Sequence, residues 1–114
     1  MKIGFIGLGN VGGKLASSLL RNKFDLTVRD LDKNLTDKFK NKGSKIANSA
    51  KELAEQTDLI ITCLPSPEIC ADVMESKDGV IHGLSKDKIW LEMSTTDESE
   101  VKRLGKLVSN KEAI

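Results

Sequence analysis

The sequence is short of several residue types that mark particular classes of protein. It has no Tyr, one Trp and three Phe, too few aromatic side chains for the stacking surfaces that bind single-stranded nucleic acid. Eighteen Lys and Arg against seventeen Asp and Glu leave a net charge of +1, so the composition gives no sign of a DNA or membrane partner. No apolar stretch approaches the roughly 20 residues that cross a bilayer. These absences leave one globular domain with a single core, over residues 1–114.

Cysteine is also scarce, with only Cys63 and Cys70 in the chain, and two residues do not make a disulfide framework. Cys63 lies in an apolar run and Cys70 in an expected helix, without His or further Cys at metal-ligand spacing. We therefore expect two buried, reduced thiols and no metal site. Such cysteine usage is typical of a reducing compartment, and we expect a cytoplasmic protein.

Apolar runs alternate with amphipathic segments along the whole chain. The first expected helix begins near Asn10 and has Val11, Leu15 and Leu19 on one apolar face. Asp32 or Asn34 can cap the next helix, which Gly43 is placed to end. Expected strands cover residues 2–6, 26–28, 45–47, 59–64 and 89–93, and further helices follow Ser49, Ser66 and the Thr95–Glu98 segment. The alternation predicts an α/β fold with a parallel sheet and helical crossovers.

A glycine-rich loop joins the first expected strand to the first expected helix. In a GxGxxG loop the first glycine permits a tight turn, the second lets a pyrophosphate approach the backbone, and the third lets the helix pack closely on the sheet. The helix N-terminus then offers amide donors and the positive end of a dipole to the phosphates. With a strand before it and a helix after it, the loop predicts a Rossmann-type, doubly wound, three-layer α/β/α domain that binds a dinucleotide. The residues are Gly7-Leu8-Gly9-Asn10-Val11-Gly12.

Asp30 follows the second expected strand, 21 positions after Gly9. That spacing matches the acidic residue that accepts hydrogen bonds from the adenosine ribose in NAD-binding domains. Its carboxylate would repel a 2′-phosphate, which favours NAD over NADP. Arg29 and Lys33 stand close enough to meet such a phosphate, so NADP stays open. A helix-capping or turn role for Asp30 is the structural alternative.

Three ordered segments add a family resemblance to this pattern. They are the opening Phe5–Gly12, the strand end Cys63-Leu64-Pro65-Ser66, and Glu92-Met93-Ser94-Thr95. Together they resemble the β-hydroxyacid dehydrogenases, which include 3-hydroxyisobutyrate dehydrogenase and the tartronate and succinic semialdehyde reductases, with 6-phosphogluconate dehydrogenase more distant. The resemblance covers Met1 to about Val108. This chain has Val11 where the family usually has Met, and Glu92 where it has Asp.

The resemblance implies roles for particular residues. Leu64 and Pro65 would contact the nicotinamide half of the cofactor, and Ser94 and Thr95 would stand near nicotinamide and substrate. NADP-dependent members commonly have Arg at the position of Leu31, so its absence here supports NAD.

The resemblance also implies what this chain does not contain. The catalytic Lys, the substrate segment and the helical C-terminal domain of the family would all lie beyond Ile114. We therefore expect a chain that binds the cofactor without catalysing hydride transfer by itself, and we assign no catalytic residue. Exposed apolar surface could make it a homo-oligomer.

One hypothesis from another class stays open. The Gly9–Ala16 run with Asp30 downstream also resembles a dinucleotide-sensing regulatory module of potassium-uptake systems. The segment after the third expected strand lacks the acidic pattern of those modules, and Ser94-Thr95 fits the dehydrogenases better.

Overall fold

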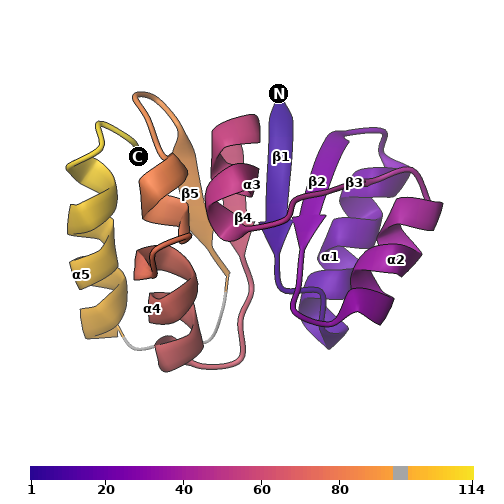
Figure 1. Ribbon diagram of the computed structural model, residues 1–114, viewed down its shortest axis with the longest axis horizontal. Helices are drawn as coiled ribbons and strands as arrows, with labels where there is room; N and C mark the ends of the chain where they lie inside the picture. Colours follow the sequence, from indigo (N-terminus) through magenta and orange to yellow (C-terminus); the bar gives the residue numbers. More distant parts are fainter. Residues whose placement is uncertain (94–97) are drawn as a thin grey trace.

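The computed structural model describes residues 1–93 and 98–114. Helices and strands alternate as the sequence predicts, and their order is β1 (Lys2–Ile6), α1 (Asn10–Arg21), β2 (Asp25–Arg29), α2 (Lys33–Asn41), β3 (Lys45–Ile46), α3 (Ala50–Gln56), β4 (Leu59–Thr62), α4 (Pro67–Glu75), the 3-10 helix η1 (Val80–Gly83), β5 (Ile89–Glu92) and α5 (Glu98–Ser109) (Figure 1).

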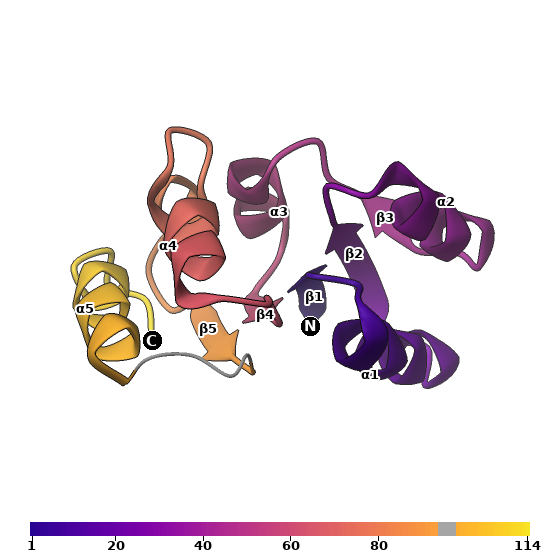
Figure 2. The same ribbon diagram turned by 90° about the horizontal axis from the view of Figure 1, so that it is seen from below.

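The strands form one parallel sheet in the order β3-β2-β1-β4-β5. One apolar cluster joins α1 and α2 to the sheet around Phe5 and Val28. A second joins α3, α4, η1 and α5 to the opposite face around Leu53 and Ile60. Figure 2 shows α1 and the α3–α4 pair on opposite sides of the sheet. The predicted doubly wound, three-layer fold is confirmed.

Polar side chains begin the helices where the sequence predicts. Of the two candidates for α2, Asp32 is the N-cap, and its carboxylate accepts the Asn34 amide at 2.9 Å. Ser49 and Ser66 cap α3 and α4 in the same way. Gly43 follows α2 with a φ of +104°, a left-handed conformation that favours glycine.

Of the three apolar residues that the spacing places on the inward face of α1, Leu15 and Leu19 pack against the Phe5 cluster as predicted, whereas Val11 does not. Val11 is 64% exposed, whereas Gly12 and Ala16 are buried against the sheet and Leu15 is half-buried. The cause is close packing at the start of the helix. A Cβ on Gly12 would lie 2.0 Å from the Gly7 carbonyl oxygen, so small residues must face the sheet there.

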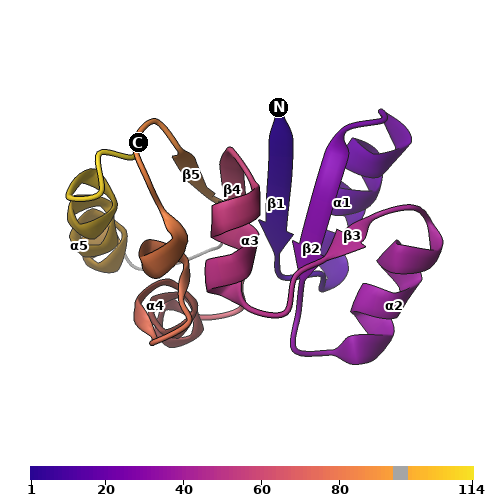
Figure 3. The ribbon, with the colours of Figure 1, turned by 45° about the horizontal axis from the view of Figure 1, so that its top comes forward.

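The outer edge of β5 forms backbone hydrogen bonds with Ile114 in the pattern of a parallel strand. The Trp90 amide donates to the Ile114 carbonyl and the Ile114 amide donates to the Lys88 carbonyl, both at 2.8 Å. Ile114 thus pairs with β5 as a residue of a sixth parallel strand would. Figure 3 shows α5 beside β5 at this end of the sheet. Within the described ranges, no helix is long and apolar enough to cross a membrane.

Candidate dinucleotide-binding site

The candidate site lies where the strand order reverses. β1 and β4 are neighbours, with Ile6 opposite Thr62 at their carboxyl ends. The chain leaves β1 toward α1 on one face and leaves β4 toward α4 on the other. The loops after the two strands therefore diverge and leave a crevice, which is where ligands bind in open α/β sheets.

Gly7 and Gly12 give the glycine-rich loop its shape. Gly7 has a φ of +102°, and a Cβ there would lie 2.1 Å from the Cys63 carbonyl oxygen in the loop after β4. Gly12 meets the Gly7 carbonyl oxygen just as closely. Both positions exclude a side chain because backbone lies in the way, so they build the turn and the seat of α1 on the sheet.

Gly9 differs from both, because a Cβ on it would meet no atom of the described residues within 4 Å, its two chain neighbours apart. It is exposed, with ordinary backbone angles of φ −66° and ψ −165°. Neither strain nor packing requires glycine at this position, which is the one where a phosphate would need open space beside the backbone.

The start of α1 is suited to an anion. Gly9 is its N-cap and has no side chain to occupy the first amides, in contrast to Asp32, Ser49 and Ser66 at the other α-helices with an identified cap. The first turn of α1 holds no acidic residue. No carboxylate of the first turn therefore neutralises the positive end of the helix dipole; the Asp30 carboxylate lies just before it, bonded to the Leu8 amide.

Asp30 joins the loop to the end of β2. Its Oδ2 accepts the Leu8 amide at 2.7 Å and its Oδ1 accepts the Asp32 amide at 2.9 Å. The second bond is the turn role that the sequence left open as an alternative, and the first was not expected. Asp30 is half-buried, so its carboxylate is oriented by the backbone while part of it still faces solvent.

A hollow of about 330 Å³ lies beyond the carboxyl ends of β2 and β3. The Arg29 guanidinium is fixed at this hollow, because its Nη1 donates to the Asn48 carbonyl at 2.9 Å. Leu31 is 91% exposed. Asp30 itself lines the hollow. The full set of lining residues is Arg29, Asp30, Leu31, Lys33, Thr36, Asp37, Ile46, Ala47 and Asn48.

The loop after β4 forms the other wall of the crevice. Leu64 is half-buried, and a Cβ on Gly7 would lie 3.2 Å from its Cδ2, so Leu64 stands directly beside the glycine-rich loop. Pro65 is exposed. Ser94 and Thr95, which the resemblance places near nicotinamide and substrate, lie outside the described residues.

A polar cluster beneath this wall was not foreseen. The Cys70 thiol donates to Glu92 Oε2 at 2.7 Å, and the Trp90 indole donates to Thr62 Oγ1 at 2.9 Å. The sequence predicts a buried thiol at Cys70, which is confirmed, whereas Cys63 is only half-buried. Burial, and then the charge of Glu92, raise the pKa of the Cys63 thiol.

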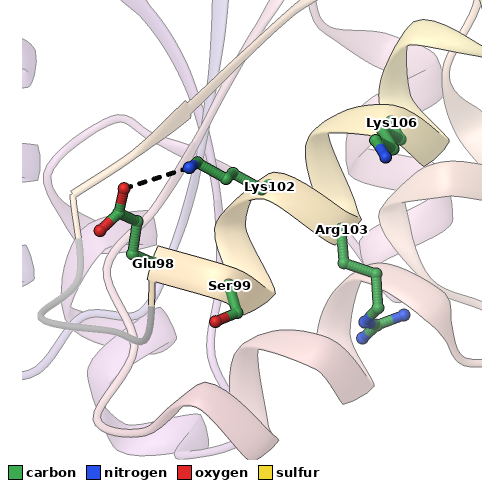
Figure 4. Close-up of a pocket in the computed structure, with 5 residues that line it drawn as sticks. All are labelled: Glu98, Ser99, Lys102, Arg103 and Lys106. Atoms are coloured by element: carbon green, nitrogen blue, oxygen red, sulfur yellow. Dashed lines mark ion pairs between the residues drawn. The ribbon is translucent and has the colours of Figure 1, made fainter.

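A second hollow, of about 460 Å³, lies on the surface of α5, away from the glycine-rich loop (Figure 4). Two of its cations, Lys102 and Arg103, already face carboxylates. Lys102 pairs with Glu98 at 3.3 Å, and the Arg103 fork contacts both Glu75 and Glu100. Arg103 also lowers the pKa of Glu75 through these hydrogen bonds. In residues 1–93 and 98–114, no group of three or more His, Cys, Asp or Glu is placed to hold a metal ion.

A Rossmann domain of the dinucleotide-binding class is defined by three features that this chain has: the strand order, the glycine-rich loop and the acidic residue after β2. Comparison with known proteins agrees. Residues 2–114 match the family described as the NAD binding domain of 6-phosphogluconate dehydrogenase. The chain belongs to this family of NAD-binding domains from oxidoreductases.

Individual relatives show the same relationship. Mouse mitochondrial 3-hydroxyisobutyrate dehydrogenase is 35% identical over 112 residues, which are 98% of this chain and 33% of the mouse protein. Mycobacterium tuberculosis 3-hydroxyisobutyrate dehydrogenase superposes with a TM-score of 0.89 at 20% identity, over 99% of this chain and 38% of that one. An imine reductase from Myxococcus stipitatus in complex with NADP+ gives 0.88 at 14% identity, with the same coverage. The chain thus spans about a third of the length of the curated relatives it matches.

Proposed function

We propose that the crevice beside Gly9 binds the pyrophosphate of a nicotinamide dinucleotide. The observation that carries the proposal is the open space at Gly9 in front of an uncapped helix start. Asn10 and Val11 begin that helix, and both are exposed. Their amides would donate to phosphate oxygens, since the first amides of a helix have no partner within it.

The adenosine half would extend over Asp30 toward the hollow beyond β2 and β3. The Leu8 and Asp32 amides orient the carboxylate of Asp30, which would accept hydrogen bonds from the ribose hydroxyls. Arg29 and Leu31 line the hollow on the same side. Leu64 and Pro65 would flank the nicotinamide half on the other side of the crevice, and Ser94 and Thr95 complete the proposed set.

The same geometry favours NAD over NADP. A 2′-phosphate would stand against the Asp30 carboxylate, and the exposed residue after it, Leu31, offers no positive charge. The Arg29 guanidinium has one arm already engaged by the Asn48 carbonyl. The imine reductase named above was solved with NADP+, and a variant of it was solved with NAD+, so this fold accommodates either cofactor. The side chains after β2 would then select between NAD and NADP in this chain.

In a longer protein this domain would serve a β-hydroxyacid dehydrogenase of the 3-hydroxyisobutyrate or semialdehyde reductase type. Hydride would pass between the hydroxyl-bearing carbon of the substrate and nicotinamide. The family's Lys would transfer the proton to or from the substrate hydroxyl, and we assign no counterpart of that Lys in residues 1–114. The chain alone would therefore bind the cofactor without turnover. The two free thiols support a reducing location, and we propose the cytoplasm, although the mouse relative is mitochondrial by name.

Calorimetric titration of the purified chain with NADH and NADPH tests the proposal. We expect saturable binding of one equivalent, with NADH binding at least tenfold tighter than NADPH. Absence of binding by a folded chain refutes the proposal. Tighter binding of NADPH refutes the role given to Asp30. A change of oligomeric state on adding the nucleotide would instead favour a sensing module.

A further inference from the structure

The inference concerns the buried polar cluster behind the loop after β4. Cys70 is on α4 and is 1% exposed, and its thiol hydrogen-bonds Glu92 Oε2 at 2.7 Å. Glu92 is the last residue of β5 and stands opposite Thr62 of β4. The bond therefore ties the middle layer of the fold, at the carboxyl end of its edge strand, to the helix that covers it.

The thiol is the donor in this bond. Burial, and then the hydrogen bond to Glu92, raise the pKa of Cys70 far above its usual range. A thiol with a raised pKa stays protonated at neutral pH, while the carboxylate accepts. Cys70 is thus neither a reactive cysteine nor a simple apolar filler.

The cluster lies at the nicotinamide side of the proposed site. The Met93 amide donates to the Thr62 carbonyl at 2.9 Å, so the carboxyl ends of β4 and β5 are held together. The charge of Glu92 contributes to the raised pKa of Cys63, which directly precedes Leu64. Glu92 is therefore within electrostatic reach of the segment that would flank nicotinamide, whereas Asp30 and the adenosine hollow lie after β2 and β3 on the other side of the crevice.

We propose that Cys70 is a positioning residue for the nicotinamide half of the cofactor, acting through Glu92. This inference rests on the proposed function. By holding the Glu92 carboxylate against α4, the thiol fixes the end of β5 relative to the loop after β4. Without the thiol, the Glu92 carboxylate loses its hydrogen bond to α4, and the end of β5 is held less firmly against the helix that follows Leu64 and Pro65.

The test compares a whole dinucleotide with its adenosine half. Dissociation constants for NADH and for AMP would be measured by calorimetry on the wild-type chain, Cys70→Ala and Cys70→Ser. We expect Cys70→Ala to weaken the binding of NADH about fivefold, which is the effect of one modest hydrogen bond, and to leave the affinity for AMP within about twofold of the wild-type value. Cys70→Ser keeps a donor and should restore most of the NADH affinity.

Val108→Ala is the matched control. Val108 is 1% exposed, belongs to the same apolar cluster and has no part in the Glu92 bond, so it removes a similar amount of buried side chain. It should lower the stability of the domain without changing the ratio of NADH to AMP affinity. Urea denaturation of each variant reports how much of the population is folded.

Glu92→Ala provides a second route, because it removes the same bond from the acceptor side. It should reproduce the selective loss of NADH affinity, and the double variant with Cys70→Ala should lose no more than Glu92→Ala alone. The inference is overturned if the affinities for NADH and AMP fall together, or if the affinity for NADH does not change. It is also overturned if Val108→Ala lowers the affinity for NADH relative to AMP as much as Cys70→Ala does. A folded wild-type chain that binds no NADH overturns the proposed function instead.

Discussion

Replacing Gly9 with Ala should separate binding from folding. Gly9 has φ −66° and ψ −165°, which Ala adopts without strain, and in the described part of the chain its added Cβ would meet nothing within 4 Å beyond its two neighbours. Two small stability effects oppose each other. Ala restricts the unfolded chain, which stabilises by about 0.4–1 kcal/mol, but it is a poorer N-cap than Gly by a similar amount. The free energy of unfolding should stay within about 1 kcal/mol of the wild-type value.

Binding of the dinucleotide should respond quite differently. The methyl group would occupy the space in which a phosphate approaches the backbone, and we expect NADH affinity to fall at least tenfold, or by about 1.4 kcal/mol. Titration calorimetry measures the affinity and urea denaturation measures the stability. If Gly9→Ala binds NADH as well as the wild type does, the pyrophosphate does not lie at this loop.

Two other glycines calibrate the result. Gly105 lies in α5, where a Cβ would also meet nothing within 4 Å, so Gly105→Ala should stabilise the helix by up to about 1 kcal/mol and leave binding unchanged. Gly7→Ala would place a Cβ 2.1 Å from the Cys63 carbonyl oxygen at a positive φ. It should cost about 3 kcal/mol of stability.

Two further substitutions test the glycine-rich loop and the ion pair between α4 and α5. Asp30→Ala removes the acceptor of the Leu8 and Asp32 amides, so it should cost about 1–3 kcal/mol in urea denaturation; an unchanged midpoint would show that these bonds do not order the loop. Arg103→Gln removes the contact that lowers the pKa of Glu75. In the wild type this contact stabilises the fold at pH values above the ordinary carboxyl pKa, and the stabilisation is lost as the pH falls through the lowered pKa of Glu75. The variant should therefore be less stable than the wild type at pH 7 and equal to it in acid, and a difference in unfolding free energy that does not vary with pH would contradict the assignment.

Local signals in the sequence determine much of this fold. Apolar runs mark the strands because a parallel sheet is covered on both faces, and Ser49 and Ser66 mark helix starts because each satisfies an amide within three residues. The glycine-rich loop and Asp30 could be paired because they belong to one β-α-β unit with a known spacing. These features depend on neighbours in the chain.

What the sequence could not predict depends on how distant segments meet. The spacing places Val11 on one face with Leu15 and Leu19, yet α1 meets the sheet through Gly12 and Ala16 and leaves Val11 exposed. Cys70 and Glu92 are 22 residues apart, on a helix and a strand that become neighbours only once the sheet has formed. No periodicity in the sequence encodes such a pair.

The central claim is that the first turn of α1 binds the cofactor's phosphates, and amide chemical shifts of the ¹⁵N-labelled chain test it directly. On titration with NADH, the account predicts that the amides of Gly9, Asn10 and Val11 shift together with that of Asp30 and give one dissociation constant. Shifts confined to the α5 hollow around Lys102, or no shifts in a folded chain, would contradict it.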